Sequence, residues 1–432
     1  MRFARTLMVL ACVLGLVAPA VAAVLDAGDF GVRGDGVTDD TPALQRALDA
    51  ARQKGGTVHL PAGRYLVAGS LTIGPGVVLR GEYVGPAGLN GTILRATGGK
   101  GQETGPGCLV LQGGANAVER IAIEYPEQVA DGEPVPYPYA ITGGPSCRIE
   151  DVFLYNAYQG INLDFCHLNL VRNVWGEALR VGIHADHLSD ISRIENVHFW
   201  PFYTHNRPKL REWVQQHGVA FQFGRSDWQS CTNTFCYGYH TGYRFFTSQA
   251  MAGVPGGDGG TTNGSFVGIG ADRCVYGIDV ENAFAIGVSI TNGLFAPFGS
   301  WDSRAVLLRK GNTGNLTLTG CNFWAVPDSL VEVQDGSLTL SACNIHEWAV
   351  GHQEAPCFRV GGGRLNVSGC TFNQGGYLAE LRGERSRVSF TGNTAPAPLT
   401  VDNGIGRRAA FQGNSPAVRP AKRQRRANGG RR

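Results

Sequence analysis

The sequence predicts an all-β fold, a single-stranded right-handed parallel β-helix with an α-helix capping its N-terminal end. Apolar stretches such as LTLTGCNFW, LTLSACNIH and LNVSGCTFN recur every 20–27 residues, which is typical of a solenoid. Each repeat holds two or three short strands separated by a bend that contains glycine. The chain has 62 glycines and only 17% charged residues, as expected for a structure rich in turns.

One segment near the N-terminus, about residues 41–54, has the pattern of an α-helix. Thr41 can cap it and Pro42 suits its first turn. Apolar residues then fall on one stripe, and Gly55 ends the segment. We expect this helix to cover the open end of the stack, because a solenoid must shield its terminal core from water.

The middle of the chain repeats a strand that opens with glycine, as in GINLD at 160–164 and GIHAD at 182–186. Side chains alternate along a strand, so Ile161 and Ile183 are expected inside the coil and their neighbours outside. Aligning Gly160, Gly182, Gly218, Gly242 and Gly277 predicts two outward columns. The first column is Asn162, His184, Ala220, Arg244 and Asp279, and the second is Asp164, Asp186, Gln222, Phe246 and Glu281.

The two ends of the chain differ from its body. Residues 1–23 have the basic start, apolar run and small-residue site of a signal peptide, and no later run is long enough to cross a bilayer. Residues 24–416 are assigned to the β-helix, and residues 417–432 to a basic disordered tail. Without both ends the chain has 29 basic and 35 acidic residues, which argues against a nucleic-acid partner.

The segment DFGVRGDGVTDDTPALQRALDAARQKGGTVHLPAGRYLV (29–67) resembles the opening of the pectate-lyase-like superfamily of right-handed β-helices. That superfamily includes glycoside hydrolase family 28-type proteins, alginate epimerases and phage tailspikes. The resemblance implies the fold and a carbohydrate partner, but not one reaction, because hydrolases, lyases, epimerases and adhesins share this opening. The polygalacturonase signatures and the Asp-Pro-His-Glu sequence of alginate epimerases are absent.

The outward columns contain the candidate catalytic residues. Asp164 and Asp186 should lie one rung apart, and a pair of carboxylates is what glycoside hydrolysis requires. His184 beside them could transfer a proton, and Arg244 could hold a carboxylate or sulfate on a sugar. Asp227, in GRSDW, is a third candidate acid. The alternative for each residue is a solvated position on the surface of the coil.

Two long intervals between the repeated glycines predict loops above this face, since extra residues must leave the coil. WPFYTHNRPKLREW lies in the first interval, and GVPGGDGGTTNG lies in the second. Aromatic rings can stack on sugars and basic groups can bind anionic ones, although loop packing is the alternative. The predicted substrate-binding residues are Trp200, Tyr203, His205, Arg207, Trp228, Asp279 and Glu281.

No metal-binding motif is recognised, and no cofactor is expected, although carboxylates on a β-helix can bind calcium. Ten cysteines follow the signal peptide. Cys321, Cys343 and Cys370 recur at one place in successive coils and are interpreted as an inward ladder of small residues. Cys231 with Cys236, or Cys147 with Cys166, are the candidate disulfides.

These observations lead to the hypothesis of a secreted or periplasmic enzyme that cleaves a polysaccharide or oligosaccharide, with anionic glycans among the candidate substrates. The first hypothesis is a glycoside hydrolase that uses Asp164 and Asp186. The alternatives are a lyase or epimerase acting on a uronate, with His184 and Arg244 in the proton-transfer and charge-neutralising roles, and a non-catalytic glycan-binding adhesin. The sequence does not determine the oligomeric state.

Overall fold

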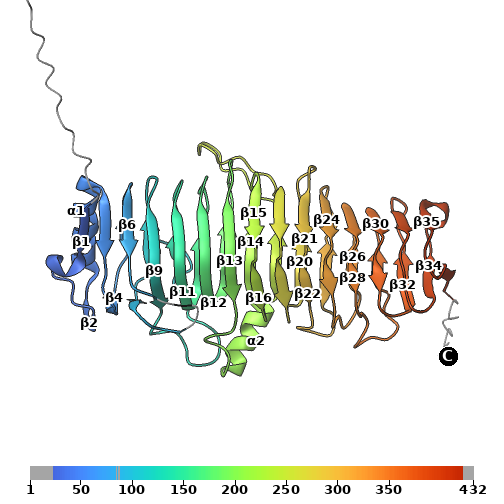
Figure 1. Ribbon diagram of the computed structural model, residues 1–432, viewed down its shortest axis with the longest axis horizontal. Helices are drawn as coiled ribbons and strands as arrows, with labels where there is room; N and C mark the ends of the chain where they lie inside the picture. The colour runs from blue at the N-terminus through green and yellow to red at the C-terminus, as the bar shows by residue number, and fades with distance from the viewer. Residues whose placement is uncertain (1–22, 84, 86–87, 422–432) are drawn as a thin grey trace, which may run out of the picture.

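The computed structural model describes residues 23–421, except residues 84, 86 and 87. Its strands run across one long axis and stack coil upon coil along it (Figure 1). All the strand pairings that form this stack are parallel, and they join three columns of strands. This arrangement confirms the predicted parallel β-helix.

The first column carries the candidate site. Its strands are β5 (Leu71–Ile73), β8 (Leu109–Leu111), β10 (Tyr139–Thr142), β11 (Arg148–Asn162), β12 (Leu170–Ala185), β14 (Val219–Phe223), β17 (Thr241–Phe245), β20 (Tyr276–Val280), β23 (Arg304–Leu308), β26 (Val331–Val333), β29 (Phe358–Val360), β32 (Gly376–Leu381), β34 (Leu399–Asn403) and β36 (Arg419–Pro420).

The second column joins strands that precede the bend of each coil. They are β1 (Ala23–Asp26), β3 (Gly56–His59), β6 (Val77–Arg80), β9 (Ala117–Glu124), β13 (Arg193–Phe199), β15 (Gln229–Thr232), β18 (Gly264–Val267), β21 (Val288–Thr291), β24 (Asn315–Thr319), β27 (Ser337–Ser341), β30 (Arg364–Ser368), β33 (Arg387–Thr391) and β35 (Ala409–Gln412).

The third column is shorter. It consists of β2 (Asp35–Asp39), β4 (Gly63–Val67), β7 (Thr92–Ala96), β16 (Phe235–Tyr237), β19 (Gly270–Asp272), β22 (Leu294–Ala296), β25 (Asn322–Phe323), β28 (Asn344–Ile345) and β31 (Thr371–Phe372). The long strands β9, β11, β12 and β13 bend and take part in more than one column.

The bend between the second and third columns needs a left-handed backbone conformation. Asn173 and Asn196 occupy it with φ of 54° and 51°, while Gly320 has φ of 62°. Asparagine and glycine tolerate this conformation better than other residues. The Asn196 amide also donates to the Asn173 side chain on the preceding coil at 2.8 Å, so these bends are joined along the stack.

The interior is apolar and stacked in register. The Phe221 and Tyr243 rings are 4.9 Å apart and nearly parallel, and Phe223 and Phe245 are 5.5 Å apart. Each fully buried aromatic side chain contributes about 1.5–3 kcal/mol through the removal of apolar surface from water. The core therefore holds the coils in one fixed register, which positions their outward side chains.

Helix α1 (Thr41–Lys54) covers the N-terminal end of the stack (Figure 1). Leu44 and Leu48 on its inner face are buried against the first coils. Thr41 is the first residue of the helix rather than its cap, and its hydroxyl bonds to Asp39 and to the backbone NH of Ala68. The remaining helices are α2 (Pro208–His217), η1 (Ala27–Phe30) and η2 (Gly406–Arg408).

The structure describes only part of the two segments that the sequence assigned to the ends of the chain. The predicted signal peptide and residues 422–432 of the predicted tail lie outside the described residues, apart from Ala23 in β1. The β-helix, assigned as far as residue 416, has one further strand pairing at Arg419 and Pro420. Within the described part of the chain, no helix has the length and apolar character needed to span a membrane.

All ten cysteines of the described chain are buried free thiols. The candidate disulfides are therefore not formed, and the Cys236 sulfur lies 3.9 Å from that of Cys274 rather than beside Cys231. Cys321, Cys343 and Cys370 are buried at equivalent positions of successive coils, as the ladder interpretation expects.

Candidate active site

The corner that follows β11 and β12 brings two acids together around a histidine. The Nδ1 atom of His187 lies 2.8 Å from Asp164 Oδ1 and 3.7 Å from Asp186 Oδ2. The Asp164 side chain is 30% exposed, whereas those of Asp186 and His187 are 8% and 7% exposed. The two predicted acids are thus neighbours, but only one of them is open to solvent.

The Asp186 carboxylate is occupied by bonds within the protein. Its Oδ1 accepts from the backbone NH groups of His187 and Arg225, both at 2.8 Å, and its Oδ2 accepts from the Ser248 hydroxyl at 3.0 Å. A methyl group at Gly224 would lie 2.3 Å from Asp186 Oδ1, so the next coil must carry glycine there. Asp186 therefore organises the corner through bonds within the protein, and little of its side chain is exposed.

His187 is held in place on every side. Its Nε2 lies 3.1 Å from the Gln249 carbonyl, and the Phe165 ring stacks on the imidazole at 4.8 Å. Burial lowers the pKa of His187, but the hydrogen bonds with Asp164 and Gln249 and the negative charges of Asp186 and Asp164 outweigh burial and raise it. The protonated imidazole can donate to Asp164 and to Gln249 at the same time.

His184 lies on the outer face of β12, among Tyr139, Gln222 and Phe246. Gln222 Nε2 is 2.9 Å from His184 Nδ1, and the Phe246 ring stacks on the imidazole at 5.9 Å. Burial is the main cause that lowers the pKa of His184, although the charges of Asp186 and Asp164 oppose it. Burial also raises the pKa of the Tyr139 hydroxyl, and Arg180 partly offsets this. Both groups are therefore neutral near pH 7.

The strand pairing corrects one predicted column. His184 pairs with Gln222, which pairs with Arg244, and Arg244 pairs with Asp279. Ala220, predicted on the outer face beside His184, is fully buried. The α2 insertion shifts the register by two residues, so Gly218 is not the equivalent of Gly182.

A polar hollow of about 450 Å³ adjoins this column. Arg244 lines it and contacts Glu281 at 3.4 Å, with both side chains 41–45% exposed. Arg309 donates two hydrogen bonds, of 2.6 and 2.9 Å, to the buried Asp279. Asp279, which the sequence predicted to bind a sugar, therefore already has a partner within the protein. Arg180 also lines the hollow, and it forms no ion pair within the described part of the chain.

The predicted sugar-binding residues of the first insertion pack on one another instead of facing His184. Tyr203 is buried, with its hydroxyl donating to a backbone carbonyl, and the Arg207 guanidinium lies 3.8 Å from its ring centre. Trp200 stacks on His205 at 5.5 Å near the third column. Among the residues described, none of these four contacts Asp164 or His184.

Asp227 and Trp228 lie at the turn after β14. The Asp227 carboxylate accepts from the Asn263 amide at 2.7 Å. The Trp228 side chain is 71% exposed. Neither is joined to the His187 corner by a side-chain contact in the described structure, so Asp227 is not the third acid of that cluster.

Sequence reasoning missed His187, Tyr139 and Arg180, and it placed Gln222 in the wrong outward column. The signal for His187 was present in HADH (184–187), where it directly follows Asp186. Its inward turn depends on a left-handed backbone, with φ of 48°, which strand alternation does not predict. No group of residues suited to hold a metal ion occurs in the described ranges 23–83, 85 and 88–421.

A known family model matches the N-terminal part of the sequence. Residues 24–106 match the family model described as rhamnogalacturonase A/epimerase, pectate lyase-like. This N-terminal part of the chain is therefore similar to pectate-lyase-like proteins, and the match covers less than a quarter of the sequence.

Its sequence relatives include enzymes that act on carbohydrates. The chain is 44% identical over 85 residues to mannuronan C5-epimerase AlgE3 of Azotobacter vinelandii, which is 19% of this chain and 5% of the relative. It is 43% identical over 74 residues to alginate lyase 7 of the same organism, covering 16% of this chain and 9% of the relative. The chain thus spans a small fraction of these relatives.

Solved structures show the same fold. The A-module of mannuronan C-5 epimerase AlgE6 from Azotobacter vinelandii superposes with a TM-score of 0.56 at 17% identity, covering 92% of this chain and all of that module. PfbA, a surface adhesin of Streptococcus pneumoniae, superposes with a TM-score of 0.55 at 16% identity, covering 85% of this chain and 93% of the adhesin. At these identities the likeness concerns the fold alone.

Proposed function

We propose that this protein is an exported carbohydrate-active enzyme that acts on a uronate-containing glycan by abstracting the proton at C5. The observation that carries the proposal is the position of His184 on the outer face of β12, in one column with Gln222 and Arg244. The Asp164 carboxylate at the next corner is partly exposed, Arg244 lines the adjoining hollow, and burial lowers the pKa of His184. Epimerisation and β-elimination both begin with this step. The reactions named for the epimerase and lyase relatives support the same class.

His184 can transfer a proton in either direction. The Gln222 amide can present its nitrogen or its oxygen to Nδ1, so the imidazole can carry its proton on Nε2 or on Nδ1. With the proton on Nδ1, the free Nε2 accepts the C5 proton. The Tyr139 hydroxyl, whose ring centre is 6.2 Å from that of His184, stays protonated and can act as the acid.

Two arginines offset the charge that develops on the substrate. Abstraction at C5 moves negative charge onto the uronate carboxylate, which cationic neighbours stabilise. Arg244 lies two strands from His184, with Gln222 between them in the column. Arg244 and Arg180 both line the polar hollow that adjoins this column. Reprotonation at C5 from the opposite face completes epimerisation, whereas cleavage of the C4–O4 bond gives a C4=C5 double bond.

Hydrolysis by the Asp164 and Asp186 pair fits this geometry less well. Glycoside hydrolysis needs two carboxyl groups that reach the substrate or its water. Asp186 is 8% exposed and already accepts three hydrogen bonds, so it has little capacity left for that role. Asp164 remains as the exposed carboxylate beside His184.

The test is to incubate the protein with polymannuronate, polyguluronate and polygalacturonate in D₂O. Epimerisation replaces the hydrogen at C5 with deuterium, which NMR detects. β-Elimination removes that hydrogen and leaves an unsaturated end that absorbs ultraviolet light. His184→Gln should lower the rate at least 100-fold, because general acid–base groups contribute about 10²–10⁴. The wild-type rate should rise with pH through a pKa below 6.5, since His184 must be neutral.

His346→Gln is the matched control, since His346 lies on a distant coil and its ring bonds only to Asn373 among the described residues. New reducing ends without ultraviolet absorbance or C5 exchange would instead indicate a hydrolase. Binding of a uronan without any reaction would indicate an adhesin. A fully active His184→Gln protein would remove His184 from the mechanism.

A further inference from the structure

Three surface hollows follow one another along the outer side of the stack. The hollow lined by Arg244 shares Gln216 and His240 with a second hollow of about 420 Å³. The second shares Gly299 and Ser300 with a third of about 510 Å³. Because neighbouring hollows share lining residues, they form a track from the hollow lined by Arg244 to the loops of later coils.

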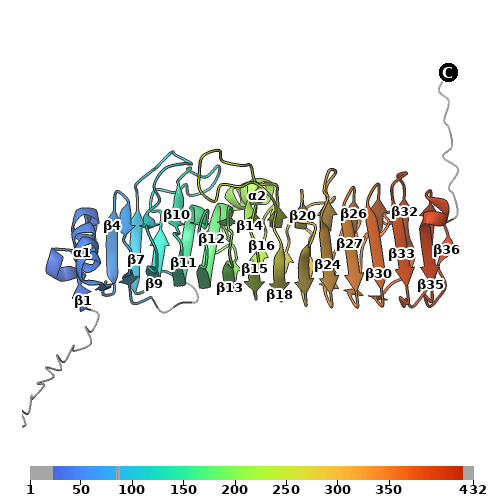
Figure 2. The same ribbon diagram turned by 90° about the horizontal axis from the view of Figure 1, so that it is seen from above.

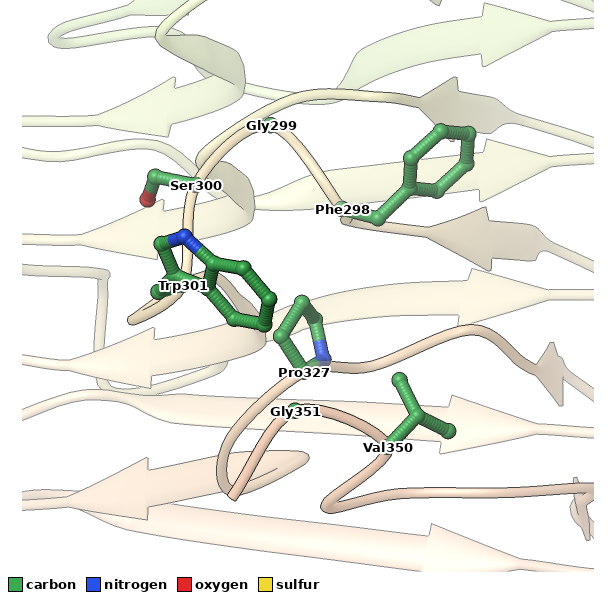
Figure 3. A pocket seen from close by; sticks show the side chains of 7 residues that line it. All are labelled: Phe298, Gly299, Ser300, Trp301, Pro327, Val350 and Gly351. Carbon is green, nitrogen blue, oxygen red and sulfur yellow. The ribbon is translucent and has the colours of Figure 1, made fainter.

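The third hollow is an aromatic and apolar platform (Figure 3). Its lining residues are Phe298, Gly299, Ser300, Trp301, Pro327, Val350 and Gly351. Trp301 is 73% exposed, which is unusual for the largest apolar side chain. Figure 3 shows its ring beside that of Pro327.

The platform is held in place by its neighbours. A methyl group at Gly351 would lie 2.7 Å from the Trp301 ring, so the loop of a later coil packs closely against the indole. The Phe298 ring lies 6.4 Å from that of Trp324, which is itself 40% exposed. An exposed indole with apolar neighbours suits the C–H face of a pyranose ring.

The charges change along the track. Three arginines and two acids line the first hollow. Arg244 pairs with Glu281 and Arg309 pairs with Asp279, which leaves the charge of Arg180 uncompensated among the residues described, whereas no charged residue lines the third hollow. Glu212 and Asp302 line the second hollow. A hydrogen bond from Ser300 holds the pKa of Asp302 below its usual value, so this carboxylate is ionised at neutral pH. A uronate is therefore favoured at the first hollow and repelled from the approach to the third.

We propose that Trp301 forms a distal binding site for an uncharged sugar residue of the same glycan chain whose uronate occupies the first hollow. The substrate is then a heteropolymer that contains both uronate and neutral sugars. This inference rests on the proposed function for the identity of the chain, but the platform can be tested without any reaction. Trp301 is a binding residue and does not take part in proton transfer.

The experiment compares wild type, Trp301→Ala, Trp301→Phe and Phe284→Ala by affinity electrophoresis in gels containing mannan, galactan, xyloglucan or polymannuronate. At least one neutral polysaccharide should retard the wild type. Trp301→Ala should weaken that retardation about tenfold, the equivalent of one aromatic contact, and Trp301→Phe should restore part of it. Phe284 is 45% exposed and outside all three hollows, so Phe284→Ala should behave as wild type.

A uronate trisaccharide separates this proposal from the proposed function, because it contains no neutral sugar that could bind at Trp301. Trp301→Ala should process it at the wild-type rate, whereas His184→Gln should not. If no neutral polysaccharide retards the wild type, or if Trp301→Ala is retarded equally, the platform proposal is overturned. If Trp301→Ala weakens only the binding of polymannuronate, the platform takes a charged ring and the selection for neutral sugars is wrong. Inactivity of every protein on uronates, with Trp301-dependent binding intact, would reject the proposed function alone.

Discussion

The His187 corner shows how one residue decides what its neighbours can do. The imidazole lies between Asp164 and Asp186, and it bonds to Asp164 through Nδ1 and to the Gln249 carbonyl through Nε2. When the imidazole is protonated, its positive charge offsets the repulsion between the two acids. The pair predicted as two catalytic acids is thus held around one histidine, and only Asp164 is partly exposed.

Replacing Asp164 with asparagine should lower the pKa of His187, since its hydrogen-bonded negative charge is lost. The folded-state pKa of His187 is raised above the unfolded value of 6.5, so its protonation stabilises the fold below pH 6.5, and this stabilisation is lost as pH rises through the folded pKa. Asp164→Asn should therefore be less stable by about 2 kcal/mol near pH 6, with a smaller difference at pH 9.

Two measurements check this prediction. NMR of the histidine ring carbons gives the pKa of His187, and urea unfolding across pH gives the stability difference. Asp258→Asn, at an exposed site in the 246–263 connection, serves as the control. A stability difference independent of pH would mean that His187 is not protonated in the native state.

At the scale of elements, the connection between β13 and α2 is tied to the coil by a buried acid. Glu177 accepts from the backbone NH groups of Tyr203 and Thr204 at 2.8 and 2.9 Å and from the Thr204 hydroxyl at 2.6 Å. Burial raises the pKa of Glu177 to about 7, although these hydrogen bonds and the charge of Arg207 oppose it. The connection is therefore built around a carboxyl group that titrates near neutral pH.

Glu177 should make the stability of the protein depend on pH. Its pKa is 4.5 in the unfolded chain and about 7 in the fold, so the native state binds the extra proton between these values. The Glu177 contribution to stability should fall as pH rises from 4.5 to 7, and Glu177→Gln should remove it. Thermal unfolding across this range tests the prediction, and hydrogen exchange of residues 200–207 localises the effect.

The control for this experiment is Glu384→Gln, because Glu384 is exposed at a turn of a later coil. Its pH profile should match that of the wild type. Identical profiles for Glu177→Gln and wild type would show that Glu177 is ionised throughout.

At the scale of the whole molecule, the stack depends on its ends. Each coil buries its apolar face only against the next coil, so the first coil needs a cover. Helix α1 supplies it with Leu44 and Leu48, both almost fully buried. Figure 2 also shows that the longer connections gather along one side of the middle of the stack, near α2.

Leu44→Asp should open the N-terminal end. Losing the buried side chain costs about 2–5 kcal/mol, and the buried charge adds to this cost. We expect oligomers through exposed strand edges, detected by size-exclusion chromatography with light scattering. Asp49→Ala, on the exposed face of the same helix, should elute at the same volume as the wild type. An unchanged elution profile for Leu44→Asp would show that α1 is dispensable as a cap.

The sequence by itself determined the β-helix, the cap and the outward position of His184 and Arg244. Apolar periodicity, glycine bends and a helical stripe are local patterns, and each specifies its own element. The sequence also brought Asp164 and Asp186 to neighbouring coils. Its prediction that Ala220 faces outward was wrong, because α2 changes the number of residues between equivalent positions.

Only the tertiary structure decided which of these side chains is accessible and what partners it has. Asp186 is buried because Ser248 reaches it from a connection two coils later, and His187 turns inward at a left-handed corner. The hollow at Trp301 likewise forms from loops of three successive coils. Such contacts join residues far apart in the chain, so no local periodicity encodes them, and they appear only when the coils are stacked in register.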